Sequence, residues 1–170
     1  MGSIINIRKS TIKDIDDILR IFELARKYMR LNNNYNQWND NYPGESDILN
    51  DISNGVSYVG FDSDGNIIMT FAFIKGKDST YKNIYEGNWL NNDDYGTIHR
   101  IASNGKVGGV LKAACDYCFS QTGNIRIDTH KDNYPMLRAL NNLGFIRCGI
   151  INCRDGSPRI AFQKIKENGK

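Results

Sequence analysis

The sequence predicts an α/β fold with one mixed, mainly antiparallel sheet of six to seven strands and helices on both faces. Two observations support this fold class. Residues 97–145 read as strand, glycine-containing turn, helix, strand and helix, and the segments on either side read as β-hairpins. The length of 170 residues, without repeats or a low-complexity linker, indicates a single domain over residues 1–170.

The N-terminal third is expected to hold one strand and two helices. Residues 3–8 read as a strand, and residues 11–31 read as an amphipathic helix that opens with a capping box. Residues 32–46 lack periodicity and are rich in asparagine and aromatic residues, which is typical of a loop. A short helix should follow, starting near Pro43 and ending near residue 54.

The middle of the chain should form a hairpin followed by a long connection. Residues 56–61 and 66–75 are strand-like and flank a turn rich in aspartate and glycine. The second of these strands is apolar on both faces, so it should lie inside the sheet. Residues 76–95 are polar and aromatic without regular spacing, and residues 146–152 and 159–164 predict a closing hairpin.

The segment at residues 97–145 carries the clearest functional signal. A strand at 97–102 leads through a turn into a helix predicted over 107–119, and this order aims free backbone N–H groups and a helix N-terminus at one point. The glycines of the turn leave room for a phosphate near the backbone, and Lys106 adds a positive charge. The alternative is a plain turn. A dinucleotide site is excluded, because no GxGxxG follows an N-terminal strand.

Composition and charge exclude several classes of protein. The chain is 40% hydrophobic and 24% charged, which is ordinary for a globular protein. The net charge of +3 is mild and no stripe of lysine or arginine forms, which argues against a nucleic-acid partner. No apolar run approaches about 18 residues and no signal peptide is evident, so we expect a cytoplasmic protein without a membrane partner.

The four cysteines are expected to be reduced thiols of the core. Cys115 and Cys118 form a C-x-x-C motif, but inside the predicted helix and not at its N-terminus, where a redox motif would lie. Cys148 and Cys153 flank the strand that follows, and the spacing of the four is unusual for zinc. We therefore expect no metal.

The segment from 97 to 145 resembles the acetyl-CoA-binding half of the GNAT N-acetyltransferase superfamily. HRIAS at 99–103 resembles the strand that pairs with the pantetheine arm, and DNYPMLRALNNLGF at 132–145 resembles the late helix. NGKVGGV departs from the family's usual arginine-or-glutamine, x, x, glycine, x, glycine pattern. The resemblance implies acetyl-CoA as co-substrate, held in a notch where the strands at 97–102 and 124–130 splay apart. The implied cofactor contacts are Ile101, Ala102, Ser103, Asn104, Gly105, Lys106, Val107, Gly108, Gly109, Asn133 and Met136.

Transfer to an amine needs a base, because a lysine-like amine with a pKa of about 10.4 is protonated at neutral pH. His99 is the predicted base, since strand alternation places Thr97, His99 and Ile101 on one face. The resemblance implies a base on this strand and places the backbone of Ile101 at the acetyl carbonyl. Asp128 is the second predicted catalytic residue. The alternative is that His99 is structural.

The resemblance also implies a general acid, usually a tyrosine seven residues after the helix asparagine. Here Leu140 occupies that position. The leaving thiolate would then be protonated by water or another group, or depart as the anion, because a free thiol has a pKa of only about 8.5.

Acceptor recognition is predicted to involve loops rich in aromatic residues. The resemblance places the loop after the first helix on the acceptor side, which makes Trp38 and Tyr42 candidates; the alternative is that both rings only anchor the loop. Glu86 and Trp89 come from the long connection, whose length and composition suit a substrate-side loop. His130 completes the predicted substrate-binding set.

The predicted function is that of an acyl-CoA-dependent N-acyltransferase. It would move an acetyl group from acetyl-CoA to a primary amine, of a small molecule or a peptide, by direct attack in a ternary complex. A homodimer is compatible with the sequence. The alternative is a non-catalytic acyl-CoA-binding sensor or interaction module, which the leucine in place of the tyrosine favours. A third reading is an interaction domain with a vestigial cofactor site and the asparagine-rich loop as its binding face.

Overall fold

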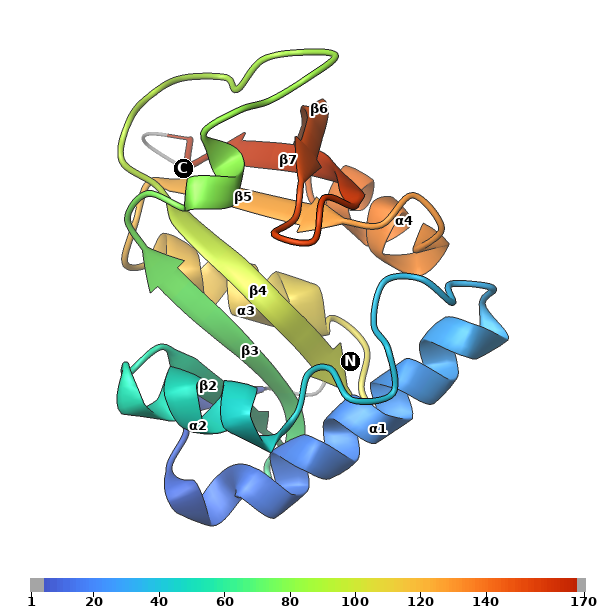
Figure 1. The fold of residues 1–170 in the computed structure, drawn as a ribbon. Coiled ribbons are helices and arrows are strands. Elements are labelled where there is room, and N and C mark those ends of the chain that lie inside the picture. Colours follow the sequence, from blue (N-terminus) through green and yellow to red (C-terminus); the bar gives the residue numbers. More distant parts are fainter. Residues whose placement is uncertain (1–4, 168–170) are drawn as a thin grey trace.

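The computed structural model describes residues 5–167, in which one sheet of seven strands has the order β1-β2-β3-β4-β5-β7-β6 (Figure 1). Neighbouring strands are antiparallel except for β4 and β5, which run parallel. The mixed, mainly antiparallel sheet is therefore confirmed. The strands are β1 (Asn6–Lys9), β2 (Ser57–Phe61), β3 (Ile67–Lys75), β4 (Gly96–Ser103), β5 (Asn124–Thr129), β6 (Ile146–Asn152) and β7 (Pro158–Ile165).

Helices cover both faces of this sheet, as predicted. The α-helices are α1 (Ile15–Leu31), α2 (Glu45–Ser53), α3 (Val110–Phe119) and α4 (Tyr134–Asn142), and two short 3-10 helices are η1 (Ile12–Asp14) and η2 (Ser79–Tyr81). In Figure 1, α1 and α2 lie in front of the sheet and α3 lies behind it. Among the described residues, none of the helices is long and apolar enough to cross a membrane.

Apolar side chains fill the space between these layers. On one face, Ile21 and Phe22 of α1 and Ile48 of α2 are buried against Val59. On the other, α3 and α4 pack onto the central strands, with Leu140 of α4 fully buried. β3 lies between β2 and β4 and is buried along most of its length, which explains why its sequence is apolar on both faces.

Two helices start later than predicted, and in both a glycine directly precedes the first helical residue. The capping box is present: the Thr11 backbone N–H donates to Asp14 at 2.8 Å. However, α3 starts at Val110 and not at residue 107, because Gly109 has a φ of 75°, which a helix interior does not allow. α2 starts at Glu45, two residues after the predicted Pro43, with Gly44 as its N-cap. Of the predicted first strand, residues 3 and 4 lie outside the described range.

The connection at residues 76–95 packs onto the C-terminal half of the sheet. This connection contains η2, and its residue Tyr85 forms an isolated antiparallel bridge with Ile150 of β6. Tyr81 and Tyr95 are buried there against Ile151. The connection thus walls one side of β4 and β5, where the site lies.

Gly87 in this connection passes so close to β6 that a larger residue should destabilise the protein. A Cβ at Gly87 would lie 1.9 Å from the carbonyl oxygen of Cys148, which belongs to a backbone that cannot easily move. We expect Gly87→Ala to lower stability by about 1 to 3 kcal/mol, the usual scale of overpacking. Urea unfolding measures this, with Gly123→Ala as the control because a Cβ there meets nothing within 4 Å. Equal stability of both variants would show that the connection is not held against β6.

Candidate active site

β4 and β5 separate soon after they meet. Among the described residues, their pairing consists of Gly96 with Ile125 and Thr97 with Arg126. From Ile98 onward, β4 has no partner on its β5 side, and the backbone groups that face β5 are left for a ligand. The splay predicted for these two strands is therefore present.

A β-bulge in β4 sets the direction of the side chains at this point. Ala72 pairs with His99 and Thr70 with Ala102, so two residues of β4 lie opposite Phe71. One of them, Arg100, has a φ of 52°. The pairing is regular from Thr97 to His99, so these two residues share a face as predicted, and the bulge interrupts the predicted alternation only between His99 and Ile101. Thr97 is buried with 1% exposure, whereas His99 lines a cleft.

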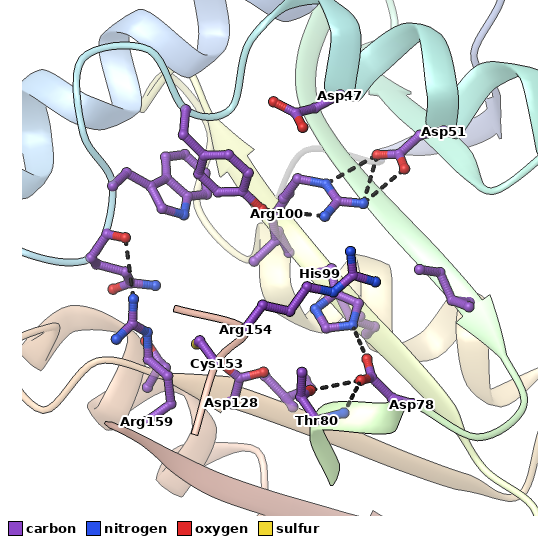
Figure 2. Close-up of a pocket in the computed structure, with 18 of the residues that line it drawn as sticks. Asp47, Asp51, Asp78, Thr80, His99, Arg100, Asp128, Cys153, Arg154 and Arg159 are labelled. Carbon is purple, nitrogen blue, oxygen red and sulfur yellow. Dashed lines mark hydrogen bonds and ion pairs between the residues drawn. The ribbon is translucent and has the colours of Figure 1, made fainter. Parts of the chain in front are cut away.

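This cleft has a volume of about 750 Å³ and crosses the gap between the two strands (Figure 2). Its walls come from the loop between α1 and α2, from α2, from η2 and from the turn between β6 and β7. Its floor is the splayed part of β4 and β5. The polar residues that line it are Gln37, Asn39, Tyr42, Asp47, Asn50, Asp51, Asn54, Asp78, Thr80, His99, Arg100, Asp128, Thr129, Asn133, Cys153, Arg154, Asp155 and Arg159.

His99 forms a pair with Asp78 in this cleft (Figure 2). The distance between His99 Nε2 and Asp78 Oδ2 is 2.9 Å. Thr80 donates to the same carboxylate from its backbone N–H at 2.8 Å and its hydroxyl at 2.6 Å. Burial opposes the charge of Asp78, but the hydrogen bonds from His99 and Thr80 outweigh it and hold the pKa of Asp78 well below its usual range. Asp78 is therefore ionised at neutral pH and accepts a hydrogen bond from the Nε2–H group of His99.

Asp128 also lines the cleft, but it already has a partner. The hydroxyl of Tyr81 donates to Asp128 Oδ1 at 2.5 Å. Tyr81 is buried, and burial together with this carboxylate raises the pKa of its phenol well above the ordinary value. The Tyr81 ring also lies 6.2 Å from the His99 ring, between centroids. The two predicted catalytic residues thus reach one cleft; their roles remain a prediction.

The bulge turns Arg100 toward α2, where sequence reasoning did not place it. Its guanidinium binds both oxygens of Asp51 at 2.8 Å and donates to the Tyr42 hydroxyl at 3.3 Å. Burial opposes the charge, but attraction to Asp51 and Tyr42 outweighs it and raises the pKa of Arg100. A left-handed residue other than glycine in a strand leaves no periodic signal, so the sequence could not predict this pair.

Two of the five predicted substrate-binding residues reach the cleft. Trp38 lines it and also packs edge-to-face on Phe22 of the core at 5.6 Å between centroids, so it anchors the loop as well. Tyr42 lines it beside Trp38. The ring of Trp38 is therefore fixed in place from the core side.

Glu86, Trp89 and His130 are placed elsewhere, which corrects their prediction. Trp89 donates from its indole to the Tyr81 carbonyl at 2.9 Å and packs under Arg126, so its ring is structural. Glu86 is exposed on the connection near β6. His130 is 7% exposed, its Nδ1 accepts from a backbone N–H, and burial lowers its pKa. None of the three is among the described residues that line the cleft.

The predicted phosphate turn lies at the N-terminus of α3. Within residues 5–167, the N–H groups from Val107 to Lys112 have no acceptor, whereas that of Ala113 bonds to Gly109. Gly105 and Gly109 both have positive φ, and a Cβ at Gly108 would meet nothing within 4 Å. The turn is thus open and rich in unused donors. Residues 102–109 lie outside the cleft that His99 lines.

The start of α4 borders the cleft. Asn133 caps the helix by accepting from the Met136 N–H at 3.3 Å and donates to Gln37 at 2.9 Å. Both Asn133 and Met136 line the cleft, as does Ile101. Leu140 is fully buried and contributes no polar group.

Three of the four cysteines are core thiols, and the fourth is not. Cys115 and Cys118 are buried in α3, and burial raises both pKa values, that of Cys115 to about 12. Cys148 is also buried. Cys153 is half-buried and lines the cleft, which corrects its assignment to the core. Burial raises its pKa as well. In the described part of the chain, no group of three or more potential ligands could hold a metal ion.

Comparison with solved structures assigns this architecture to a family. A GNAT-family acetyltransferase from Streptococcus agalactiae is 35% identical over 99% of both chains, with a TM-score of 0.86. GNAT-family acetyltransferases from Bacillus cereus and Listeria monocytogenes are 21% and 17% identical, with TM-scores of 0.62 and 0.66, and show the same fold. They cover 97% and 95% of this chain, and this chain covers 99% and 94% of theirs. No protein-family model matches the sequence, and no curated protein is significantly similar to it.

The seven-stranded mixed sheet has the fold of these acetyltransferases, and the 35% identity to the first of them shows the family. The chain belongs to the GNAT family of acetyltransferases. Members of this family use acetyl-CoA.

Proposed function

We propose that this protein transfers the acetyl group of acetyl-CoA to a primary amine, by direct attack of the amine in a ternary complex. The observation that carries the proposal is the His99–Asp78 pair, which lies in the cleft where β4 and β5 part. A base near the attacking nitrogen is what an amine acceptor requires.

The residues present fit acetyl-CoA. The unused N–H groups from Val107 to Lys112 form a donor set for a pyrophosphate, and the N-terminus of α3 favours negative charge there. The unpaired β5 side of β4 offers a pantetheine amide the hydrogen bonds that a neighbouring strand would make. Acetyl-CoA supplies a thioester whose carbonyl is open to attack.

The proton of the acceptor has a route through His99. Because Asp78 stays ionised and accepts from Nε2, the lone pair of His99 is on Nδ1, which has no hydrogen-bond partner among the described residues. Neutralising a lysine-like amine at pH 7 would otherwise cost roughly 4 to 5 kcal/mol of the barrier. Asp78 is a positioning residue: it holds the ring and stabilises the imidazolium that forms.

The second candidate is a non-catalytic acyl-CoA-binding module. It is favoured by Leu140, which is fully buried where the resemblance implies a tyrosine acid. The acid is not essential, since a thiolate with an ordinary pKa of about 8.5 can leave without one. A histidine oriented by a half-buried carboxylate is a feature that catalysis requires and that binding alone does not. The acetyltransferase reading is therefore preferred.

Thiol release distinguishes the two functions. The purified protein is incubated with acetyl-CoA and a panel of small amines, amino acids and peptides, and free thiol is measured while products are weighed by mass spectrometry. We expect thiol release that depends on one class of amine, together with a product heavier by one acetyl group. Stabilisation by acetyl-CoA without any thiol release would support the binding module instead.

Loss of the carboxylate at Asp78 should weaken the base without removing it. We expect Asp78→Asn to lower kcat/KM by roughly 10-fold, a part of the whole effect of a general base. The loss should appear in kcat and not in the affinity for acetyl-CoA, because Asp78 orients the imidazole and is not expected to contact the cofactor. Asp155→Asn is the control, since Asp155 lines the same cleft but bonds to Ser157. An unchanged kcat/KM in Asp78→Asn would show that Asp78 does not orient the base.

A further inference from the structure

One wall of the cleft holds a buried guanidinium that lacks a carboxylate partner. Arg159 in β7 is 8% exposed and lines the cleft. Its hydrogen bonds go to neutral oxygens: the Ser157 hydroxyl at 3.1 Å and the carbonyls of Pro158 at 3.0 Å and Gln37 at 3.3 Å. No ion pair among residues 5–167 includes it. A buried cation without a counter-charge is unfavourable, so the site is suited to an anion.

The groups around Arg159 do not neutralise it. His130 is buried, and burial first and the charge of Arg159 second lower its pKa, so it stays neutral. Ser157 separates Arg159 from the nearby Asp155, because its hydroxyl accepts from the guanidinium and donates to the carboxylate at 2.6 Å. Within the described residues, Arg159 therefore has no carboxylate in direct contact, and the charge of Asp155 acts on it only across Ser157.

A second cation on the same hairpin reaches the same space. Arg154 lies in the turn between β6 and β7, lines the cleft, and has no hydrogen bond or ion pair within the described residues. Figure 2 shows its side chain pointing into the cleft, while Arg159 points toward the loop that carries Gln37. Two arginines from one hairpin thus border the cavity in which the base lies.

The carboxylates of the cleft, by contrast, all have hydrogen-bond donors. Each accepts from a side chain or a backbone N–H of the protein, so none needs a ligand to satisfy it. They are Asp47 with the Gly44 N–H, Asp51 with Arg100, Asp78 with His99 and Thr80, Asp128 with Tyr81, and Asp155 with Ser157. Of the three arginines that line the cleft, Arg100 is paired with Asp51, whereas Arg154 and Arg159 have no ion pair within the described residues.

The loop between α1 and α2 restricts the size of what can enter here. Gln37 accepts from Asn133 at 2.9 Å through its side chain and from Arg159 at 3.3 Å through its carbonyl, so the loop is tied to α4 and to β7. The rings of Trp38 and Tyr42 stand beside it. A small molecule fits a cleft closed in this way better than a segment of a folded protein does.

We propose that the acceptor is a small amine that also carries an oxyanion, a carboxylate or a phosphorus oxyanion, and that Arg159 and Arg154 bind this anion. The amine would then face His99 from across the cleft. The proposal rests on the proposed function, because it names the acceptor class of the same site. It places a zwitterionic, amino-acid-like molecule in the cleft and excludes polyamines and simple alkylamines as preferred acceptors.

Matched acceptors test the class. Amino acids are compared with their amides and with the corresponding decarboxylated amines, and 2-aminoethylphosphonate with ethanolamine, in the thiol-release assay. We expect the preferred acceptors to carry a carboxylate or a phosphonate, with kcat/KM at least about 10-fold above that of the uncharged counterpart, the scale of a charge-assisted hydrogen bond. Comparison of the carboxylate acceptors with the phosphonate acceptor shows which of the two anions the site prefers. Equal rates, or a preference for amines without an anion, would overturn the proposal.

Variants of the two arginines test the residues. Arg159→Gln should raise KM for the anionic acceptor by roughly 10-fold to 100-fold and affect the rate with its amide much less. Arg154→Gln should act in the same direction, and because Arg154 is exposed this variant should fold even if the first does not. Arg147→Gln is the control, since Arg147 is exposed on the same hairpin but does not line the cleft. Equal losses of activity with the acid and with the amide would show that Arg159 only holds the loop between α1 and α2 in place.

Two further measurements distinguish this proposal from binding of the cofactor by the two arginines and from a failure of the proposed function. The affinity for acetyl-CoA, measured by calorimetry, should not change in either arginine variant; a loss there would assign the anion to the cofactor and contradict the proposal. If no amine releases thiol, the proposed function fails, and calorimetry of the same amino acids with the wild type in the presence of CoA still decides the inference. Binding of the acids but not of their amides supports it, and binding of neither rejects it.

Discussion

His99→Ala should lower kcat/KM at pH 7 by about 100-fold or more, the usual contribution of a general base. This corresponds to about 2.7 kcal/mol of lost transition-state stabilisation. Affinity for acetyl-CoA should be nearly unchanged, because the cofactor contacts expected on β4 are backbone groups and not the imidazole. Steady-state kinetics and calorimetry on the same preparation measure both quantities.

The pH dependence separates catalysis by His99 from a structural role. The defect of His99→Ala should shrink as the pH approaches the acceptor's own pKa, because free amine is then plentiful without a base. His99→Gln is the informative control: its amide can still donate to Asp78 and preserve the fold, but it cannot accept the proton. We expect it to be as inactive as the alanine variant. Recovery of activity with glutamine, or a defect of equal size from pH 6 to 10, would move the base elsewhere.

Gly108→Asp should abolish the stabilisation of the protein by acetyl-CoA. In the wild type, a ligand at 100 times its Kd adds about 2.7 kcal/mol to the free energy of unfolding, which raises Tm by roughly 5 to 10 °C for a chain of this size. The aspartate would place a carboxylate among the unused N–H groups of the turn and repel a pyrophosphate. Thermal unfolding with and without acetyl-CoA measures the effect.

The structure predicts that this variant folds normally. A Cβ at Gly108 meets nothing within 4 Å, and the residue does not have the positive φ that its neighbour Gly109 has. Gly108→Asn has the same size without the charge, so it should retain part of the stabilisation. A folded Gly108→Asp variant that still responds fully to acetyl-CoA would show that the phosphates bind at another place.

Local chemistry allowed the sequence to predict most of the elements. The capping box at Thr11, the apolar pattern of β3 and the glycine after α4 each act over a few residues, and their elements lie where they were expected. The start of α3 was wrong by three residues, because the helical spacing of Val107 continues through a glycine whose conformation no spacing reveals. The spacing of apolar residues indicates which face of an element is buried, but it carries no information on the backbone angle φ.

The site could be predicted only where it follows the strands. His99 was found because it lies on β4, but Asp78, its partner, comes from an irregular connection 21 residues earlier in the chain, and nothing in that segment marks it. Trp89 illustrates the opposite error. An aromatic ring in a polar loop suggested a substrate contact, yet the ring packs on a buried arginine of β5. Whether a loop residue turns inward or outward depends on the elements it meets.

Gln37 connects the two sides of the cleft through hydrogen bonds of its side chain and of its backbone. Its side-chain oxygen accepts from Asn133, whose own oxygen caps α4, and its backbone carbonyl accepts from Arg159. Movement of the loop between α1 and α2 therefore breaks its hydrogen bond to Asn133 at the start of α4, and movement of α4 breaks the same bond and releases the loop. A ligand that steadies one side lowers the entropic cost of ordering the other, and by linkage the benefit is the same in both directions. We therefore expect the binding of one substrate to raise the affinity for the other through the hydrogen bonds of a single glutamine.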